Sequence, residues 1–240
     1  MPSDRHKPAA GGSGAEHAAG LVLQNELDAP PALFEYWLTK RGIGFRIVRA
    51  WEGQIPADPT RFAWVASLGA ADSVNQREKD WIRAEVELLR RAAAAEVPVL
   101  GICFGGQALS AALGGVVTAA GETSVGWFEI ETSDPALVPP GPWAHFNSEC
   151  FSVPNGATRL AGTRSGPGAF RLGPHLGVQF HPEATPTIVD AWAVSEAELL
   201  TGLGVDPRTL SAEGKRHGDA AARQAFELFD AWWAMSGDGA

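Results

Sequence analysis

Cysteine is scarce in this sequence, because only Cys103 and Cys150 occur among 240 residues. Two cysteines this far apart in the chain form neither a short metal-binding knuckle nor a disulfide framework. Such sparse use of cysteine is typical of proteins in reducing compartments. We therefore expect a cytoplasmic protein that holds no disulfide and needs neither a metal ion nor a cofactor.

Basic charge is also in short supply, with 19 Lys and Arg residues against 28 Asp and Glu residues and a net charge of -9. The basic residues form no cluster, which argues against a nucleic-acid partner. No apolar run has the length of a membrane span, and residues 1–19 lack the apolar core of a secretion signal. We expect residues 1–19 to be a flexible tail, residues 20–236 to be one domain, and neither nucleic acid nor a membrane to be a partner.

The first half of the chain alternates between strand and helix patterns. Short apolar runs predict strands at 20–26, 44–51 and 61–69, and helical spacing predicts helices at 30–42 and 76–96. In the second of these helices, an apolar stripe faces the core and the charged residues are expected to form a solvated face. The alternation predicts an α/β fold with a mostly parallel central sheet flanked by helices.

The second half of the chain changes to short strands separated by Gly, Pro and Asn turns. These strands are predicted at 126–132, 143–153, 158–163, 169–173 and 176–183. We expect most of them to form hairpins at the sheet edge or a small added antiparallel sheet. The C-terminal stretch is predicted to be helical, and Phe226, Phe229 and Trp233 have the spacing of core residues.

A glycine-rich turn holds one of the two cysteines. In "PVLGICFGGQALSAALGG", an apolar strand is followed by Gly101-Ile102-Cys103-Phe104-Gly105 and then by a helix pattern. This is the G-x-nucleophile-x-G pattern of a sharp strand-to-helix turn, with cysteine in place of serine. A helix N-terminus offers free N–H groups and a positive dipole end, which favour a reactive thiolate. The alternative is a small buried cysteine without chemistry.

A nucleophilic cysteine needs a base and a group that orients this base. "GVQFHPE" supplies His181 and Glu183, which project to the same side of an extended segment because they are two residues apart. The alternative is a surface turn that carries two unrelated polar groups. Taken together with the cysteine turn, the motif favours a Cys-His-Glu triad.

The two motifs "GICFGGQ" and "GVQFHPE" resemble those of the class I glutamine amidotransferases. The resemblance extends through "VASLGAADSVN", "SVGW" and "HFNSECFSVPNGATRLA", and it covers about residues 20–190. It implies a flavodoxin-like fold, and the chain is similar to the stand-alone subgroup that resembles the amidotransferase part of GMP synthase. An α/β-hydrolase would place its acid before its histidine, which does not fit the order found here.

The resemblance also implies roles for single residues. Cys103 is the nucleophile, His181 the base and Glu183 the acid of a catalytic triad. The N–H groups of Ala70 and Phe104 are the oxyanion donors, and Gln107, Ser148 and Glu149 bind the substrate. The usual Gly-Gly-Pro of the oxyanion loop is Gly69-Ala70-Ala71 here, so we expect backbone strain and a less committed loop.

These roles imply a glutaminase that forms a cysteinyl thioester and releases glutamate and ammonia. The sequence has no phosphate-binding G-x-x-x-x-G-K-[ST] loop, and the stretch after Glu183 is too short for a synthetase domain. We therefore expect the ammonia acceptor to lie on a separate synthetase subunit. Two alternatives stay open, namely a γ-glutamyl hydrolase that acts on a γ-glutamyl amide, and a non-catalytic regulatory subunit with the same fold.

Overall fold

The computed structural model describes residues 19–237 and contains a central eight-stranded sheet with the strand order β2-β1-β3-β4-β10-β9-β8-β6. The first five strands of this order pair in parallel and the last three in antiparallel fashion. The strands are β1 (Gly20–Gln24), β2 (Phe45–Arg49), β3 (Val65–Ser67), β4 (Val99–Ile102), β6 (Glu131–Thr132), β8 (Thr158–Thr163), β9 (Gly166–Leu172) and β10 (His175–Val178). A separate antiparallel pair consists of β5 (Val117–Phe128) and β7 (Trp143–Phe151).

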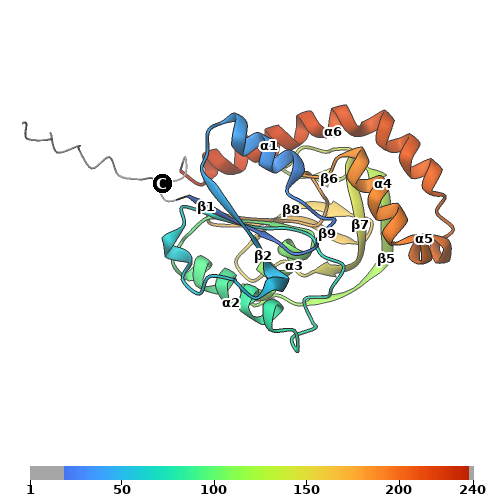
Figure 1. Cartoon of the computed structure of the whole chain (residues 1–240). Helices are drawn as coiled ribbons and strands as arrows, with labels where there is room; N and C mark the ends of the chain where they lie inside the picture. The colour runs from blue at the N-terminus through green and yellow to red at the C-terminus, as the bar shows by residue number, and fades with distance from the viewer. Residues whose placement is uncertain (1–18, 238–240) are drawn as a thin grey trace, which may run out of the picture.

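Helices cover both faces of the sheet, with α1 and α6 on one face and α2 and α3 on the other (Figure 1). The helices are α1 (Ala32–Lys40), α2 (Asp80–Ala94), α3 (Phe104–Ala112), α4 (Pro186–Ser195), α5 (Ala197–Leu203) and α6 (Pro207–Met235), with short 3-10 turns at η1 (Ala50–Glu52) and η2 (Pro59–Arg61). The predicted fold class, with its small added antiparallel sheet, is confirmed. Among residues 19–237, no helix combines the length and apolar character needed to cross a membrane.

The core on the α1/α6 face is largely aromatic. Phe34 of α1 packs against Phe229 of α6 with ring centroids 5.0 Å apart, and Trp64 meets Trp232 edge to face at 5.9 Å. All four side chains are almost fully buried. The predicted core residues Phe226 and Trp233 pack against this cluster but stay partly exposed. This layer anchors the long α6 helix to the first α/β unit of the chain.

Several predicted element boundaries are wrong. The helix predicted at 76–96 begins at Asp80, and the strand predicted at 176–183 ends at Val178. The strand predicted at 126–132 begins already at Val117. The stretch "VTAAGETS" has the composition of a turn, but it pairs with β7 across a bulge between Ala119 and Ser124. The predicted tail at 1–19 lies, apart from Ala19, outside the described residues, and the single domain at 20–236 stays a prediction.

Candidate active site

Cys103 lies at the sharp turn between β4 and α3. Its backbone has φ 52° and ψ -109°, a conformation that non-glycine residues rarely adopt. The neighbouring chain is tightly packed, since a Cβ on Gly101 would lie 2.5 Å from the Gly105 carbonyl oxygen and one on Gly105 would lie 2.0 Å from the Ser67 carbonyl oxygen. Such strain costs about 1–3 kcal/mol and persists where the surroundings hold it. The glycines therefore let the turn form and hold the thiol at the N-terminus of α3.

His181 and Glu183 follow β10 and form a buried pair. His181 Nδ1 lies 2.8 Å from Glu183 Oε1, and both residues are at most 5% exposed. Burial alone lowers the pKa of His181, but the Cys103 thiolate and the Glu183 carboxylate together outweigh it and raise this pKa to about 10. The raised pKa favours a protonated imidazole at His181, held between the side chains of Cys103 and Glu183.

Gly69 is the point where the cysteine and histidine side chains converge. A Cβ on Gly69 would lie 2.8 Å from His181 Cε1 and 3.8 Å from Cys103 Cβ. Only glycine fits here without displacing the imidazole, because carbon atoms of different residues normally stay about 3.5 Å or more apart.

The two predicted oxyanion donors come from different segments, Ala70 from the loop after β3 and Phe104 from the start of α3. Within residues 19–237, neither the Ala70 N–H nor the Phe104 N–H donates a backbone or side-chain hydrogen bond, whereas the Ala71 N–H donates to Glu26 Oε2 at 3.2 Å. None of Gly69, Ala70 and Ala71 has a positive φ, so the strain that alanine would suffer at a positive φ does not arise in this loop, and its lower commitment stays a prediction. Alanine therefore fits the backbone conformation of this loop, and the hydrogen bond from the Ala71 N–H to the Glu26 carboxylate stabilises the loop.

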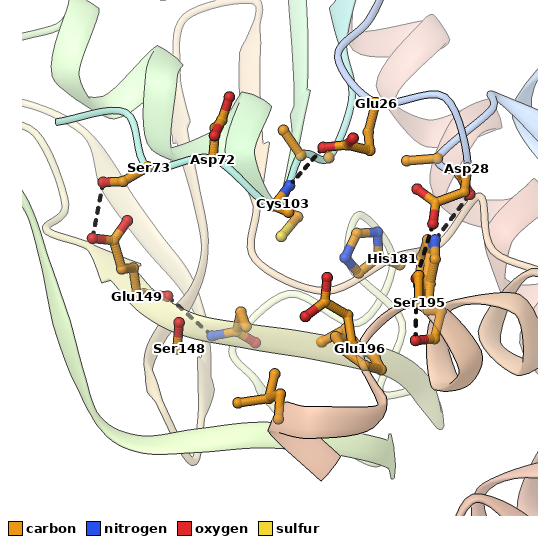
Figure 2. Close-up of a pocket in the computed structure, with 18 of the residues that line it drawn as sticks. Glu26, Asp28, Asp72, Ser73, Cys103, Ser148, Glu149, His181, Ser195 and Glu196 are labelled. Carbon is orange, nitrogen blue, oxygen red and sulfur yellow. Dashed lines mark hydrogen bonds between the residues drawn. The ribbon is translucent and has the colours of Figure 1, made fainter. Parts of the chain in front are cut away.

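A cavity of about 420 Å³ opens over Cys103 and His181 (Figure 2). The predicted substrate residues Gln107, Ser148 and Glu149 all line it. Gln107 Nε2 donates to the Glu149 carbonyl oxygen at 3.1 Å, and Ser73 Oγ donates to Glu149 Oε1 at 2.9 Å. The volume lies within the range of about 300–1,000 Å³ that is typical of small-molecule sites. Six of the eight predicted site residues thus line one cavity, while Glu183 contacts His181 from behind and Phe104 directly follows Cys103.

Sequence reasoning missed Gln179, which is fully buried beneath the thiol. Its Nε2 lies 3.7 Å from Cys103 Sγ, and its Oε1 accepts a long hydrogen bond of 3.4 Å from Gln107 Nε2. This amide therefore links the nucleophile to a residue of the cavity wall. A glutamine at the end of an apolar strand pattern does not by itself indicate a reaction, so only its place before the His-Pro-Glu motif was a signal.

Glu85 of α2 corrects the expectation that all charges on this helix are solvated. It is fully buried, and its Oε1 accepts hydrogen bonds from Ser67 Oγ at 2.5 Å and Asn25 Nδ2 at 3.1 Å. Asn25 Nδ2 also donates to the Leu68 carbonyl oxygen at 2.9 Å. Burial raises the pKa of Glu85 to about 7, although both hydrogen bonds act against the rise. The cluster ties α2 to the start of the oxyanion loop.

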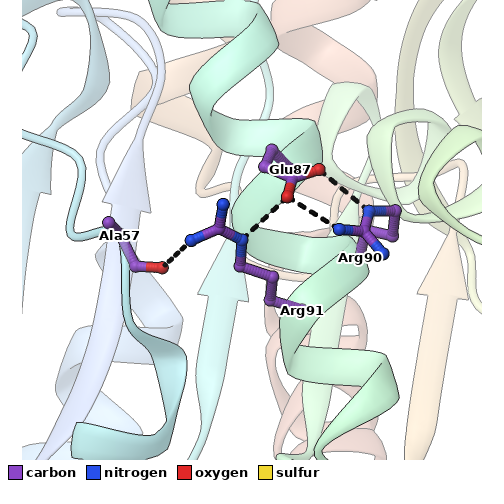
Figure 3. Close-up of polar contacts among 4 residues, drawn as sticks. All are labelled: Ala57, Glu87, Arg90 and Arg91. Atoms are coloured by element: carbon purple, nitrogen blue, oxygen red, sulfur yellow. Dashed lines mark hydrogen bonds and ion pairs between the residues drawn. The ribbon is translucent and has the colours of Figure 1, made fainter.

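Glu87, two residues further along α2, shows the solvated state that was expected. Its carboxylate pairs with Arg90 and Arg91, and Arg91 Nη1 also donates to the Ala57 carbonyl oxygen at 3.1 Å (Figure 3). These hydrogen bonds lower the pKa of Glu87 to about 2. Glu85 instead lies three residues after Ile82 and four before Leu89, and this helical spacing was the signal that it faces the core.

Three further residues with reactive or titratable side chains lie outside the predicted triad. His175 is the buried first residue of β10, and burial lowers its pKa to about 4. Cys150 lies on β7 and is partly exposed. His145 is buried among aromatic rings, and burial together with the charges of His181 and Arg164 lowers its pKa to about 3. None of the three joins the cavity.

Comparison with known proteins shows which family part of this chain resembles. Residues 73–151 match the family described as glutamine amidotransferase class-I. GMP synthase (glutamine-hydrolyzing) from Parafrankia sp. is 36% identical over 123 residues, which are 48% of this chain and 23% of that protein. The enzyme of the same name from Shewanella sediminis is 35% identical over 111 residues, or 39% of this chain and 21% of that protein. The chain thus spans about a fifth of the length of these curated relatives.

Solved structures show the same fold over most of the chain. A glutamine amidotransferase from Thermotoga maritima has a TM-score of 0.81 at 23% identity, covering 92% of this chain and 99% of that chain. One from Methylobacillus flagellatus has a TM-score of 0.81 at 24% identity, covering 91% and 95%. Residues 73–151 thus match the class I glutamine amidotransferases and resemble part of GMP synthase, and nearly the whole chain shares the fold of solved glutamine amidotransferases.

Proposed function

We propose that this protein hydrolyses the side-chain amide of L-glutamine through a thioester on Cys103, with His181 and Glu183 as its acid–base pair. The observation that carries the proposal is the buried convergence of Cys103 and the His181–Glu183 pair over Gly69, at the floor of a cavity. A nucleophile, an oriented base and an open volume beside both are the parts that acyl transfer needs.

The proposed reaction begins when the Cys103 thiolate attacks the carboxamide carbon of glutamine. The N–H groups of Phe104 and Ala70 receive the negative charge that develops on the oxygen. The His181 imidazolium then gives its proton to the leaving nitrogen, the C–N bond breaks and ammonia departs. The neutral imidazole next takes a proton from water, which attacks the thioester and releases glutamate and the thiolate. Glu183 keeps Nδ1 oriented and stabilises the imidazolium.

The amino-acid end of glutamine would lie where Gln107, Ser148 and Glu149 line the cavity. A carboxylate such as that of Glu149 suits the α-ammonium group. We propose that the ammonia passes to an acceptor activated by a separate synthetase subunit.

The test is incubation with glutamine, with ammonia and glutamate release as readouts. We expect hydrolysis by the wild-type protein, none by Cys103→Ser, and wild-type rates for the control Cys150→Ser. A glutamine-analogue electrophile such as diazo-oxo-norleucine should label Cys103. A folded wild-type protein that neither releases ammonia nor reacts with the analogue would support the non-catalytic regulatory subunit instead.

A further inference from the structure

The cavity over Cys103 is strongly acidic. Five carboxylate residues line it, and no Lys or Arg does; they are Glu26, Asp28, Asp72, Glu149 and Glu196. Of these five carboxylates, only Asp72 has a cationic partner among the described residues, since Lys79 Nζ lies 2.5 Å from its Oδ1. L-Glutamine brings one ammonium and one carboxylate group into this cavity. The carboxylates therefore exceed what the amino-acid end of glutamine can neutralise.

Most of the carboxylates lie toward one of two ends of the cavity. Figure 2 shows Asp72, Ser73, Ser148 and Glu149 on one side of Cys103, and Asp28 and Ser195 on the other side, beyond His181. In this view Glu196 lies just below His181, and Glu26 lies above Cys103. In an acyl transfer, the acyl group and the departing amine lie on opposite sides of the attacked carbon. Because His181 would protonate the departing nitrogen, we call the side with Asp28, Ser195 and Glu196 the leaving-group end.

Hydrogen bonds and ring packing hold the leaving-group end together. Ser195 Oγ donates to Asp28 Oδ2 at 3.0 Å, and Trp192 Nε1 donates to the Asp28 carbonyl oxygen at 2.9 Å. The Trp192 ring also packs against the His181 ring, with centroids 4.6 Å apart. One tryptophan therefore fixes both the Asp28 loop and the imidazole that protonates the leaving group.

Apolar side chains lie beside these carboxylates. Trp192, Leu199 and Phe146 line the same cavity, and Trp192 meets Phe146 edge to face at 5.8 Å. Ammonia, the leaving group of glutamine, fills no such space and gains nothing from apolar walls. An alkyl chain that ends in an ammonium group matches both, because the chain contacts the apolar walls and the ammonium group faces Asp28 and Glu196.

From this arrangement we infer that the site accepts γ-glutamyl amides of alkyl diamines, whose leaving amine carries a second, protonated amino group. This inference rests on the proposed thioester chemistry of the same triad. The Cys103 sulfur takes the γ-glutamyl group, the amide C–N bond breaks, and the His181 proton goes to the departing nitrogen. Water then cleaves the thioester, so that the products are glutamate and the free diamine.

The test compares kcat/KM for three substrates of similar length on the purified protein. They are the γ-glutamyl amides of 1,4-diaminobutane, n-butylamine and 4-aminobutyrate, whose leaving amines are cationic, neutral and anionic. A partly exposed ion pair contributes up to about fivefold, so two carboxylates predict a preference of about tenfold or more for the diamine amide over the butyl amide. The 4-aminobutyrate amide should be the poorest substrate.

Charge-neutralising variants locate the preference. Asp28→Asn and Glu196→Gln should each reduce the diamine-to-butyl ratio about threefold to fivefold. Glu198→Gln is the matched control, because it removes the same charge from the exposed surface of α5 outside the cavity, and it should leave this ratio unchanged. Hydrolysis of the butyl amide or glutamine without any preference for the diamine amide would overturn this inference and leave the proposed function intact. If no γ-glutamyl amide is cleaved and Cys103 is not labelled, the proposed function itself fails.

Discussion

Gly69 offers a direct test of the geometry proposed for the triad, through the variant Gly69→Ala. The added methyl group would lie 2.8 Å from His181 Cε1. Because Gly69 does not have a positive φ, alanine can adopt its backbone conformation. The variant should therefore displace the imidazole without disturbing the backbone.

The size of the effect follows from this contact. Carbon atoms in contact prefer a separation of about 3.5–4.0 Å, so the imidazole or the loop must move by about 0.7 Å or more. A displacement of about 1 Å in an active site can lower the rate about 100-fold. We expect kcat for glutamine hydrolysis to fall about 10- to 100-fold, while the free energy of unfolding changes by less than about 1 kcal/mol.

The assay is steady-state ammonia release together with chemical denaturation of the same samples. Gly121→Ala is the matched control, because a Cβ at this exposed glycine of β5 would meet nothing within 4 Å and its φ is not positive. It should retain wild-type kcat. A Gly69→Ala protein with unchanged kcat would show that His181 is not held against this loop during the reaction.

Three further predictions concern the acid of the triad, the buried glutamate and the aromatic core. Glu183→Gln should lower kcat about 10³- to 10⁴-fold, less than His181→Ala at about 10⁶-fold, in assays of ammonia release; equal losses would contradict an orienting role. The pKa of Glu85 rises from 4.5 to about 7, so the proton it holds stabilises the folded state fully below pH 4.5, and this stabilisation is lost as the pH rises through 7. Relative to Glu85→Gln, the wild-type protein should therefore lose up to about 3 kcal/mol of unfolding free energy between pH 5 and pH 8, measured by urea denaturation, and parallel pH profiles would refute this. Phe229→Ala should cost about 3–5 kcal/mol of unfolding free energy, and a loss below 1 kcal/mol would show that the aromatic core is not as tightly packed as described.

The sequence predicted the turn at Cys103 because the information there is local. Gly101 is needed for a close approach to Gly105 within the same turn, and the strand and helix patterns that flank Cys103 are adjacent, although Gly105 itself makes room for Ser67 of β3. His181 and Glu183 were predictable for the same reason, since two residues of spacing place their side chains together. Motifs of this kind need no knowledge of the distant chain.

Features that depend on distant partners were harder to predict. The carboxylate of Glu85 is buried because Asn25, just after β1, and Ser67 of β3 supply hydrogen-bond donors, and composition alone does not reveal such a pairing. The leaving-group end likewise forms only because α4 packs on the loop after β1, which places Asp28 beside Ser195. The sequence therefore indicated the reaction class more fully than the shape and charge of the cavity.

The formation of a thioester on Cys103 is the central claim, and trapping it is the most direct test. The protein is mixed with glutamine, quenched with acid during turnover, digested and analysed by mass spectrometry. We predict a glutamyl adduct on the peptide that contains Cys103, and its absence in Cys103→Ala. An adduct on Cys150, or ammonia release by Cys103→Ala at the wild-type rate, would contradict the account.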